Sequence, residues 1–398
     1  MQCYATVHST VLQDRSPTVK FDTTQLLAAL KAIKPAIAPR ATLPILSAVA
    51  FEVLTPDFIA VRATNLDITL RVNVPNQDPK NTAYDGHVVI LYASLMKVID
   101  SKKSDTIEIS AADNFKARVT QGNRSVTVDT LAYEDVPVFP EMKTHPLFPL
   151  TLTQWTKIRE RVFPCVARDQ SRPVLHGVNV IRDDDQGIKF VAADGFRLTI
   201  HATGEYLSYT FPGFIVPIEA LEAIPAKCEP YFWELSDGGA YVKVEINLPW
   251  SKHADDMAMM MYARTLDGHF PNYQEVEKSS NYSATHEIRV EEDVIQEARK
   301  FIKDSDGIKF HEDRASMKVH TVGEYTWNGT STTLKPIDPS ELATIKGGYV
   351  MLNAEYVADT LYAAKDGVLT LQGSSDNPWK VDSGDTQTII MPMVLGTS

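Results

Sequence analysis

The spacing of hydrophobic positions predicts three amphipathic helices, each near the start of a longer segment of the chain. In each helix apolar residues recur at i, i+3, i+4 and i+7, which places them on one helix face. The three stretches are Thr23–Ile33, Thr153–Val166 and Glu291–Ile302. Thr23 and Thr153 are candidate N-caps of the first two, because a threonine hydroxyl can accept a hydrogen bond from a free backbone N–H.

Beyond each predicted helix the pattern changes to the period-two alternation of half-buried strands. Strand-to-helix stretches begin at Gly86, Gly213 and Gly348. Each is followed by a pair of predicted strands, namely Thr106–Ser110 with Lys116–Thr120, Tyr231–Leu235 with Tyr241–Ile246, and Val368–Leu371 with Trp379–Val381. Each segment is therefore predicted to contain a helix, strands, a second helix and further strands.

A direct repeat supports this organisation. Residues Pro44, Leu46, Val49, Ile59 and Ala63 recur 129 positions later as Pro173, Leu175, Val178, Ile188 and Ala192. A weaker match at the same offset leads from Lys189 and Phe190 to Lys318 and Val319. Because repeats at a fixed offset indicate repeated structural units, the sequence predicts an α+β protein with three tandem copies of one fold.

The domain boundaries follow from two linker-like stretches, the proline-rich Pro137–Pro149 and the polar Lys278–Thr285. They predict an N-terminal extension at residues 1–18 and repeats at 19–144, 145–281 and 282–398. The extension has no apolar stretch of the kind that a secretory signal carries.

Composition places the chain among soluble intracellular proteins. No run of about 18 apolar residues is present, so no membrane span is expected. The three cysteines, Cys3, Cys165 and Cys228, are odd in number and lack metal-ligand spacing. We therefore expect reduced thiols in a cytoplasmic protein.

The charge is unevenly distributed. The whole chain carries −12, which by itself argues against a nucleic-acid partner. Six helix-like segments, at 23–37, 92–103, 153–172, 218–227, 290–303 and 354–365, contain 15 basic and 11 acidic residues. They carry +4, which leaves −16 on the rest of the chain. This segregation is compatible with helices that face DNA, and equally with the solvated helix faces on which lysine and arginine are common.

Sequence motifs for catalysis are missing. There is no nucleotide-binding glycine loop, no HExxH and no GxSxG, and the ten histidines do not cluster with carboxylates or cysteines. The acidic stretch Asp183–Gly187 could form a metal loop, but a solvated turn between two strands is favoured, and Asp194–Gly195 is interpreted as a turn too. We predict no catalytic residue, no metal site and no cofactor.

Six segments carry a resemblance to a known family. They are Arg40–Ser47, Ala63–Ile68, Ser171–Val178, Val191–Leu198, Asp267–Val276 and Ile389–Leu395. In this order and spacing the chain, from about Val19 to Leu395, resembles the bacterial DNA sliding clamp, the beta subunit of DNA polymerase III. The resemblance implies three like domains joined head to tail and two chains closed into a ring. Helices would line the hole and antiparallel sheets would form the outer shell.

The same resemblance implies a hydrophobic groove that takes short peptides from partner proteins. Its residues would be Leu175, Gly195, Phe196, Arg197, Leu198, Pro271, Val276, Asn353, Tyr356, Ile389, Ile390, Met391, Pro392, Met393, Val394 and Leu395. The expected partners are the replicative polymerase, the clamp loader, repair polymerases, ligase and mismatch-repair proteins. Glu275 and Val394 stand where the family often has arginine, so the rim of the groove is less basic here.

Two further surfaces are expected from the family. The residues predicted to face duplex DNA are Lys31, Lys34, Arg40, Lys157, Arg161, Arg168 and Arg172. The residues predicted to close the homodimer are Val128 in one chain and Phe301 and Ile302 in the other. Phosphate contact without base readout suits a ring that slides.

Two other functions stay open at this stage. One is an enzyme such as a nucleotidyltransferase, which would need paired carboxylates on one rigid face. The other is a diverged clamp-like protein that binds partners without being loaded on DNA.

Overall fold

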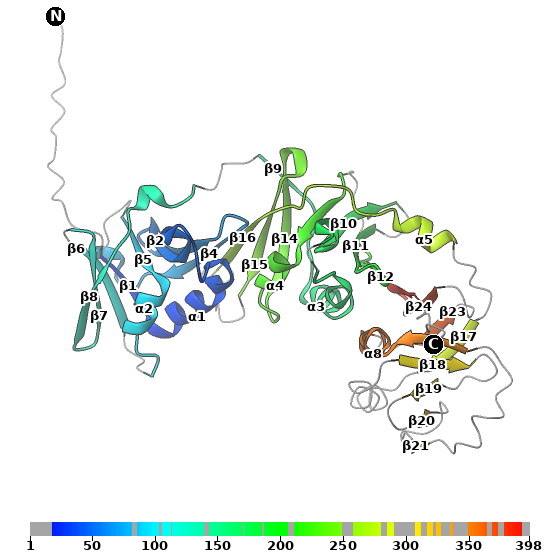
Figure 1. The fold of residues 1–398 in the computed structure, drawn as a ribbon. Helices are drawn as coiled ribbons and strands as arrows, with labels where there is room; N and C mark the ends of the chain where they lie inside the picture. Colours follow the sequence, from blue (N-terminus) through cyan, green and yellow to red (C-terminus); the bar gives the residue numbers. More distant parts are fainter. Residues whose placement is uncertain are drawn as a thin grey trace, which may run out of the picture. The chain divides into compact units, whose positions relative to one another are not determined.

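The computed structural model of the chain (Figure 1) describes residues 18–391 with internal gaps. The residues that are not described within this range are 82–85, 103–105, 113, 139–142, 170, 185–186, 206–210, 249–257, 280–284, 290–306, 312–316, 321–323, 328–334, 337–348, 364–367 and 373–377. The chain divides into two compact units. The first comprises Met1–Glu141, Ala223–Pro225 and Glu245–Tyr262, and the second comprises the remainder.

The first unit contains two antiparallel groups of strands with helices packed on them. Its elements are β1 (Thr18–Asp22), α1 (Thr23–Ile33), β2 (Ala48–Thr55), β3 (Phe58–Thr64), β4 (Ile68–Pro75), β5 (His87–Leu91), α2 (Tyr92–Val98), β6 (Thr106–Ala112), β7 (Lys116–Gln121) and β8 (Arg124–Asp129), with 3-10 turns at Lys34–Ala36, Pro44–Ser47, Pro79–Asn81 and Tyr133–Asp135. The strand orders are β1-β6-β7-β8 and β5-β2-β3-β4.

Helix α1 forms where the sequence predicts it, and it packs against β3 and β4 as well as β1. Leu26, Leu30 and Ile33 are fully buried on its inner face. Burial of each such side chain contributes on the order of 2 kcal/mol. The helix is capped by Asp22, whose carboxylate accepts a hydrogen bond from the Gln25 N–H at 3.0 Å. The prediction that Thr23 is the cap was wrong, because Thr23 is already the first helical residue.

The second unit contains the remaining elements. They are β9 (Thr144–Pro146), α3 (Leu152–Arg161), β10 (Gly177–Asp183), β11 (Gly187–Ala193), β12 (Arg197–Ala202), β13 (Phe214–Pro217), α4 (Ile218–Ala223), β14 (Glu229–Ser236), α5 (Tyr273–Ser279), β17 (Thr285–Arg289), β18 (Gly307–His311), β19 (Met317–His320), β20 (Glu324–Trp327), β21 (Lys335–Pro336), β22 (Tyr349–Asn353), α8 (Ala354–Ala363), β23 (Val368–Gln372), β24 (Trp379–Asp382) and β25 (Thr386–Ile390), with 3-10 turns at Phe163–Cys165, Pro173–Leu175 and Asp237–Gly239. Strands β15 (Tyr241–Asn247) and β16 (Ala258–Arg264) have residues in both units.

An aromatic core holds helix α3 in the second unit. Trp155 of α3 is fully buried and lies near Trp233 of β14, with 6.3 Å between ring centroids. Phe148 stacks on Trp233 at 5.5 Å, and Phe190 of β11 meets it edge-on at 6.1 Å. These ring geometries are the favourable ones for aromatic pairs. Helix α3 is thereby fixed against β12 and β14, and its other side contacts α8 (Figure 1).

The ends of α3 differ from those predicted. Thr151, not Thr153, is the N-cap, and it forms a capping box with Gln154, whose N–H donates to the Thr151 hydroxyl at 3.3 Å. The α-helix also stops at Arg161 rather than Val166. Pro164 explains this, because a proline inside the helix would remove a backbone hydrogen bond and clash with the preceding turn.

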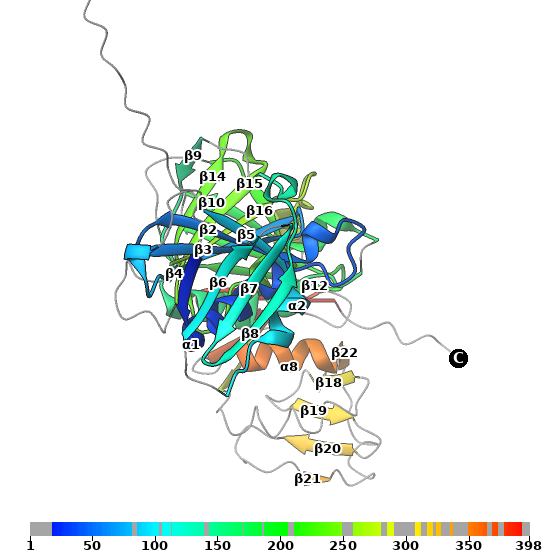
Figure 2. The same ribbon diagram turned by 90° about the vertical axis from the view of Figure 1, so that its left-hand side faces the viewer.

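The threefold repeat is confirmed by strand order. The same antiparallel arrangement occurs as β5-β2-β3-β4, as β13-β10-β11-β12 and as β22-β18-β19-β20. In each copy the first strand in this order runs directly into a helix, which is α2, α4 or α8. Figure 2 shows the third of these helices, α8, beside β18 and β22 of its own copy. The sheet order therefore repeats although the sequence match of the third copy is weak.

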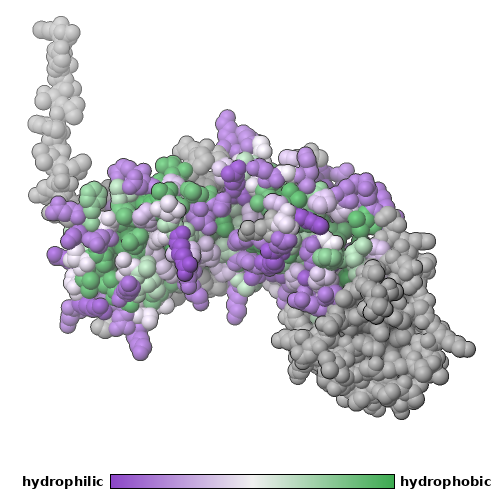
Figure 3. Space-filling model, in the orientation of Figure 1, coloured by the Kyte–Doolittle hydropathy of each residue, from purple (hydrophilic) through white to green (hydrophobic). Residues whose placement is uncertain are grey.

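The predicted turns and thiols agree with the structure. Asp183 ends β10 and Gly187 begins β11, so the acidic stretch is a hairpin connection. Asp183 pairs with Lys189 of the same hairpin at 2.7 Å. Cys165 and Cys228 are buried free thiols, and Cys3 lies outside the described residues. In the coloured part of the face drawn in Figure 3, hydrophilic side chains alternate with groups of hydrophobic ones.

The cap of α3 offers a matched pair of exposed threonines for a stability test. We expect Thr151→Ala to lower the free energy of unfolding by about 1 kcal/mol, because the N3 amide loses its acceptor. Thr153→Ala should change it by less than about 0.5 kcal/mol, since Thr153 lies inside the first turn. Urea unfolding followed by tryptophan fluorescence measures both. Equal losses would show that the capping box does not stabilise the helix.

Candidate functional site

A cavity of about 470 Å³ lies in the second unit beside strand β25. Nine of the residues predicted for the groove line it: Leu175, Gly195, Phe196, Arg197, Leu198, Pro271, Val276, Ile389 and Met391. Six others line it as well: Arg172, Ala193, Phe270, Asn272, Tyr273 and Pro378. The two sets come from four parts of the chain that are far apart in sequence.

The floor of the cavity is built where β12 pairs with β25. The two strands are antiparallel, with Leu198 opposite Ile389. Both side chains are nearly fully buried and belong to one apolar cluster with Val191 and Tyr273. Ile390 is also fully buried but does not line the cavity. Its assignment to the groove stays a prediction: Ile390 lies opposite Arg197 of β12, on the other face of the strand from Ile389.

The rim of the cavity exposes large apolar side chains. Phe196 is 63% exposed, Met391 43% and Val276 38%. The Met391 N–H donates to the Phe196 carbonyl at 2.8 Å, which continues the strand pairing up to the rim. An exposed apolar group beside a hollow is a common feature of a binding surface.

Gly195 shapes one wall. Its φ of +94° is a conformation that favours glycine, and a Cβ there would lie 2.6 Å from the Arg172 guanidinium. The Asp194 carboxylate holds the turn by accepting the Phe196 and Arg197 N–H groups, each at 2.9 Å. The interpretation of Asp194–Gly195 as a turn is confirmed, and this turn brings Arg172 to the cavity.

Arg197 is a buried cation at the end of β12 that links two of the repeats. Its guanidinium donates to Asp194 at 3.0 Å and to Asp359 of α8 at 2.8 Å, and also to the Pro164 carbonyl. It lies 4.2 Å from the centroid of the Tyr356 ring. Burial acts to lower the pKa of Arg197, but the Cys165 sulfur and the two carboxylates outweigh it and raise this pKa. The guanidinium is thus a permanent charge that fixes α8 beside β12.

Two predicted groove residues support the site without lining it. Tyr356 lies under the Arg197 guanidinium. Asn353 caps α8, since its side-chain oxygen accepts from the N–H groups of Glu355 at 2.9 Å and Tyr356 at 3.2 Å. Pro392, Met393, Val394 and Leu395 lie outside the described residues.

Sequence reasoning missed six lining residues. Phe270, Asn272 and Tyr273 belong to the segment Asp267–Val276 that it had singled out, so their aromatic and amide character was the available signal. Glu275 of the same segment accepts a hydrogen bond from Asn272 at 2.8 Å at the start of α5. Ala193 lies in the segment Val191–Leu198, which was also singled out, but its small side chain gives no signal of its own, and Pro378 lies outside all six segments.

The residues predicted to face DNA fall into two groups. Lys31, Lys34 and Arg40 are exposed in the first unit and form no ion pair with a described residue. Arg168 pairs with Glu222 at 2.8 Å, and Arg172 lines the cavity.

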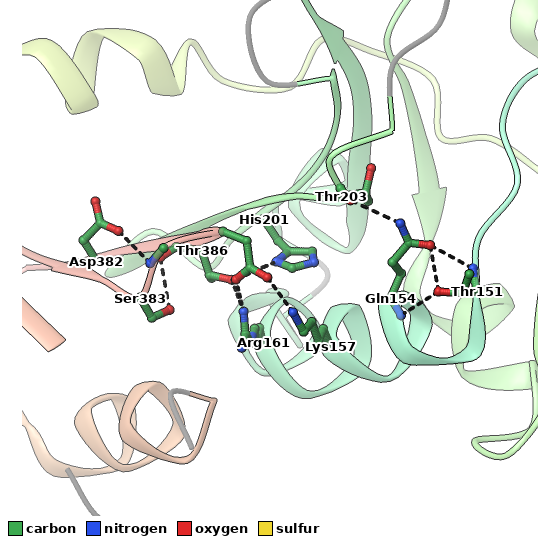
Figure 4. Close-up of polar contacts among 11 residues, drawn as sticks. Thr151, Gln154, Lys157, Arg161, His201, Thr203, Asp382, Ser383 and Thr386 are labelled. Atoms are coloured by element: carbon green, nitrogen blue, oxygen red, sulfur yellow. Dashed lines mark hydrogen bonds and ion pairs between the residues drawn. The ribbon is translucent and has the colours of Figure 1, made fainter. Parts of the chain in front are cut away.

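Lys157 and Arg161 of α3 form a cluster with Asp385 in the turn between β24 and β25. Lys157 lies 2.8 Å from Asp385, and Arg161 also pairs with it and donates to Thr386 at 2.8 Å (Figure 4). Burial acts to raise the pKa of Asp385, but Lys157, Arg161 and His201 together hold this pKa below its usual value. The Arg161 side chain is only 13% exposed, so most of its surface is turned away from solvent.

The residues predicted for the homodimer are only partly visible. Val128 lies half-buried on β8, which is at the end of its sheet and has β7 as its neighbour. Phe301 and Ile302 lie outside the described residues.

Two other kinds of site are absent from the described part of the chain. No group of three or more histidine, cysteine, aspartate or glutamate side chains there could hold a metal ion. No described helix is long and apolar enough to cross a membrane.

Comparisons with known proteins agree with this architecture. Residues 18–140 match the family model of the DNA polymerase III beta subunit, N-terminal domain. The beta sliding clamp of Chlamydia pneumoniae is 25% identical over 375 residues, which cover 92% of this chain and 96% of that protein. Among solved structures, the sliding clamp of Pseudomonas aeruginosa bound to griselimycin superposes with a TM-score of 0.75 at 18% identity, covering 96% of this chain and 100% of that chain. The Helicobacter pylori clamp bound to a DNA ligase peptide gives 0.74 at 16%, covering 95% and 100%.

The repeated strand order and these likenesses define the class of protein, which is one with the DNA-clamp fold. Within this class, residues 18–140 match the N-terminal domain of the DNA polymerase III beta subunit, and over most of its length the chain is similar to the beta sliding clamps. These likenesses support a sliding-clamp function, and the sliding clamps are non-catalytic processivity factors, which argues against the nucleotidyltransferase alternative.

His201, beside Asp385, makes the second unit sensitive to acid. It is 1% exposed, and burial lowers its pKa to about 4 from an ordinary value of 6.5. Between these values the unfolded chain binds a proton that the folded chain does not, so stability falls as the pH drops from about 6.5 to about 4. We expect His201 to lower the free energy of unfolding by about 3 kcal/mol over this pH range.

Urea unfolding at pH 7.5, 6 and 5 checks this expectation. His201→Asn should flatten the pH dependence, whereas the exposed His269→Asn serves as the control and should leave it unchanged. If the free energy of unfolding depends on pH to the same extent in both variants, the acid sensitivity comes from other groups.

Proposed function

We propose that this chain is a sliding clamp that encircles duplex DNA as a homodimeric ring and tethers other proteins through the cavity beside β25. The observation that carries the proposal is this cavity, built between two clamp repeats in a chain of three. The partners would be the replicative polymerase, the clamp loader, repair polymerases, ligase and mismatch-repair proteins. They would reach it in the cytoplasm, where bacterial replication takes place.

The chemistry of the cavity suits a short peptide with apolar side chains. A volume of about 470 Å³ is within the range of ligand sites and accommodates a few side chains. Leu198 and Ile389 offer an apolar floor, and Met391 on the rim can adapt its flexible side chain to different ligands. Clamps of other species bind a DNA ligase peptide and griselimycin, and we propose that this cavity takes ligands of the same kind.

Two copies would close the ring through the edges of their sheets. Strand β8 lies at the end of its sheet and carries Val128. An edge strand presents unpaired N–H and C=O groups that another chain can extend. We propose that β8 meets the region of Phe301 and Ile302 in the second copy.

DNA contact would come from exposed cations that bind phosphate without reading bases. Lys31, Lys34 and Arg40 suit this role because they are exposed and form no ion pair with any residue that the structure describes. Lys157, Arg161 and Arg168 would have to leave the carboxylates of Asp385 and Glu222 first. This internal neutralisation favours a second candidate, a clamp-like protein that binds partners but is not loaded on DNA.

The topology of the DNA complex separates the two candidates. The chain is incubated with a clamp loader and nicked circular DNA, and the circle is then cut with a restriction enzyme. We expect the chain to elute with circular DNA and to be released after the cut, because a ring slides off a free end. Retention after cutting would indicate ordinary binding, and no association with the circle would support the second candidate.

The same assay tests the DNA-facing residues. The triple variant Lys31→Gln, Lys34→Gln and Arg40→Gln should be recovered on circles at a lower level, and its difference from the wild type should be largest at low salt and shrink as salt rises. Arg168→Gln is the matched control and should change recovery less, since its guanidinium already pairs with Glu222.

The cavity is tested with griselimycin, whose binding to the Pseudomonas clamp makes it a suitable probe. Val276→Glu places a charge on the exposed apolar rim. We expect the dissociation constant of this variant for griselimycin to rise at least about tenfold, which corresponds to about 1.4 kcal/mol. Leu43→Glu changes another exposed apolar side chain, in the first unit, and should bind like the wild type. Equal binding by both variants would place the ligand site elsewhere.

A further inference from the structure

Strand β25 has two different faces, and only its register on β12 decides which of them meets the cavity. On one face Leu198 lies opposite Ile389 and forms the cavity floor. On the other face the pairs are Thr199 with Thr388 and His201 with Thr386. Because the side-chain period of a strand is two, a shift by one residue would exchange these faces. Ile389 would then leave the cavity and Thr388 would enter it.

The polar face is a ladder of buried side-chain hydrogen bonds across the two strands. Thr199 and Thr388 are joined at 3.0 Å, and His201 Nδ1 meets Thr386 Oγ1 at 2.8 Å. Cys165 contacts the Thr199 hydroxyl at 2.9 Å from the side of α3. Each of these five residues is at most 5% exposed. Buried polar groups without partners are costly, so this ladder favours a single register.

Asp385 closes the ladder at the end next to α3. Its carboxylate binds Lys157 and Arg161 of the helix, and it also accepts from the Thr386 hydroxyl at 3.1 Å. Arg161 in turn donates to Thr386, so the helix, the turn and the strand end share one network (Figure 4). Loss of these contacts is costly, because removal of the carboxylate leaves the largely buried Arg161 without its charged partner.

We infer that Asp385 is a positioning residue for the cavity: it anchors β25 to α3 in one register, and this register presents Ile389 and Met391 to the ligand. Asp385 lies four residues before Ile389, about 13 Å away at the ~3.3 Å rise of a strand. It therefore acts through the strand and not by touching the ligand. This inference rests on the proposed function of the cavity as a ligand site.

The test compares Asp385→Asn with the wild type in griselimycin binding and in ¹³C-methyl methionine NMR. We expect the dissociation constant of the variant to rise at least about tenfold and the Met391 methyl signal, assigned with Met391→Leu, to shift or split. Lys157→Met, which removes a partly exposed partner and leaves the Arg161–Asp385 pair in place, should show the same changes to a smaller extent. Asp385→Glu keeps the charge and should recover part of the affinity.

A matched control distinguishes positioning from a general loss of stability. Glu52→Gln breaks the Arg62–Glu52 pair of the first unit, which is 2.7 Å long and has side chains 12% and 17% exposed. It should lower the unfolding midpoint but leave griselimycin affinity and the Met391 signal unchanged. Unchanged affinity in folded Asp385→Asn and Lys157→Met would refute the inference. Failure of the wild type to bind griselimycin would contradict the proposed function, and with it this inference.

Discussion

The pairing of β12 with β25 is the interaction on which the second unit depends. These strands are about 190 residues apart in sequence, as the Thr199–Thr388 bond between them shows. Their pairing joins the sheet of one repeat to strands of the next in a single eight-stranded order. It creates an apolar floor on one face and a buried polar ladder on the other. Arg197, at the end of β12, then ties α8 to the same joint.

This arrangement explains why polar groups are buried under α3. An apolar surface there would pack as well, but it would not distinguish one register from the next, since apolar contact is not directional. Hydrogen bonds between Thr199 and Thr388 are satisfied in one alignment only. The polar face thus supplies the specificity that the apolar face lacks, and the cavity depends on both.

The sequence predicted the elements well because they depend on local periodicity. The strand-to-helix segments at Gly86, Gly213 and Gly348 all formed, and the 129-residue offset correctly indicated a repeated strand order. Helix ends were less predictable. Asp22 and Thr151 each lie close to the predicted cap, and the choice between neighbouring candidates depends on backbone geometry that residue type does not reveal.

The site was predictable only as far as its motifs extend. The motif around Asp194–Leu198 and the Ile389–Met391 strand led to the cavity. The partners of the basic residues were beyond reach of the sequence. Arg161 meets Asp385 across 224 residues, so part of the positive formal charge of a helix is in fact balanced by a distant turn. Counting charges along a helix cannot detect such a pairing.

Internal neutralisation of this kind is compatible with sliding. Each phosphate that a cation neutralises makes the DNA affinity fall more steeply as salt rises. It adds roughly 0.9 to the steepness of the plot of log affinity against log salt concentration. A protein that stays on DNA by affinity alone needs many free cations. A closed ring does not, because its link to DNA is topological and breaks only when the ring opens or the DNA ends. In the proposed clamp, the few unpaired cations of the first unit would orient the duplex, while Lys157 and Arg161 stabilise the joint that forms the ligand cavity. The same helix α3 would then serve the architecture of the cavity more than the binding of DNA.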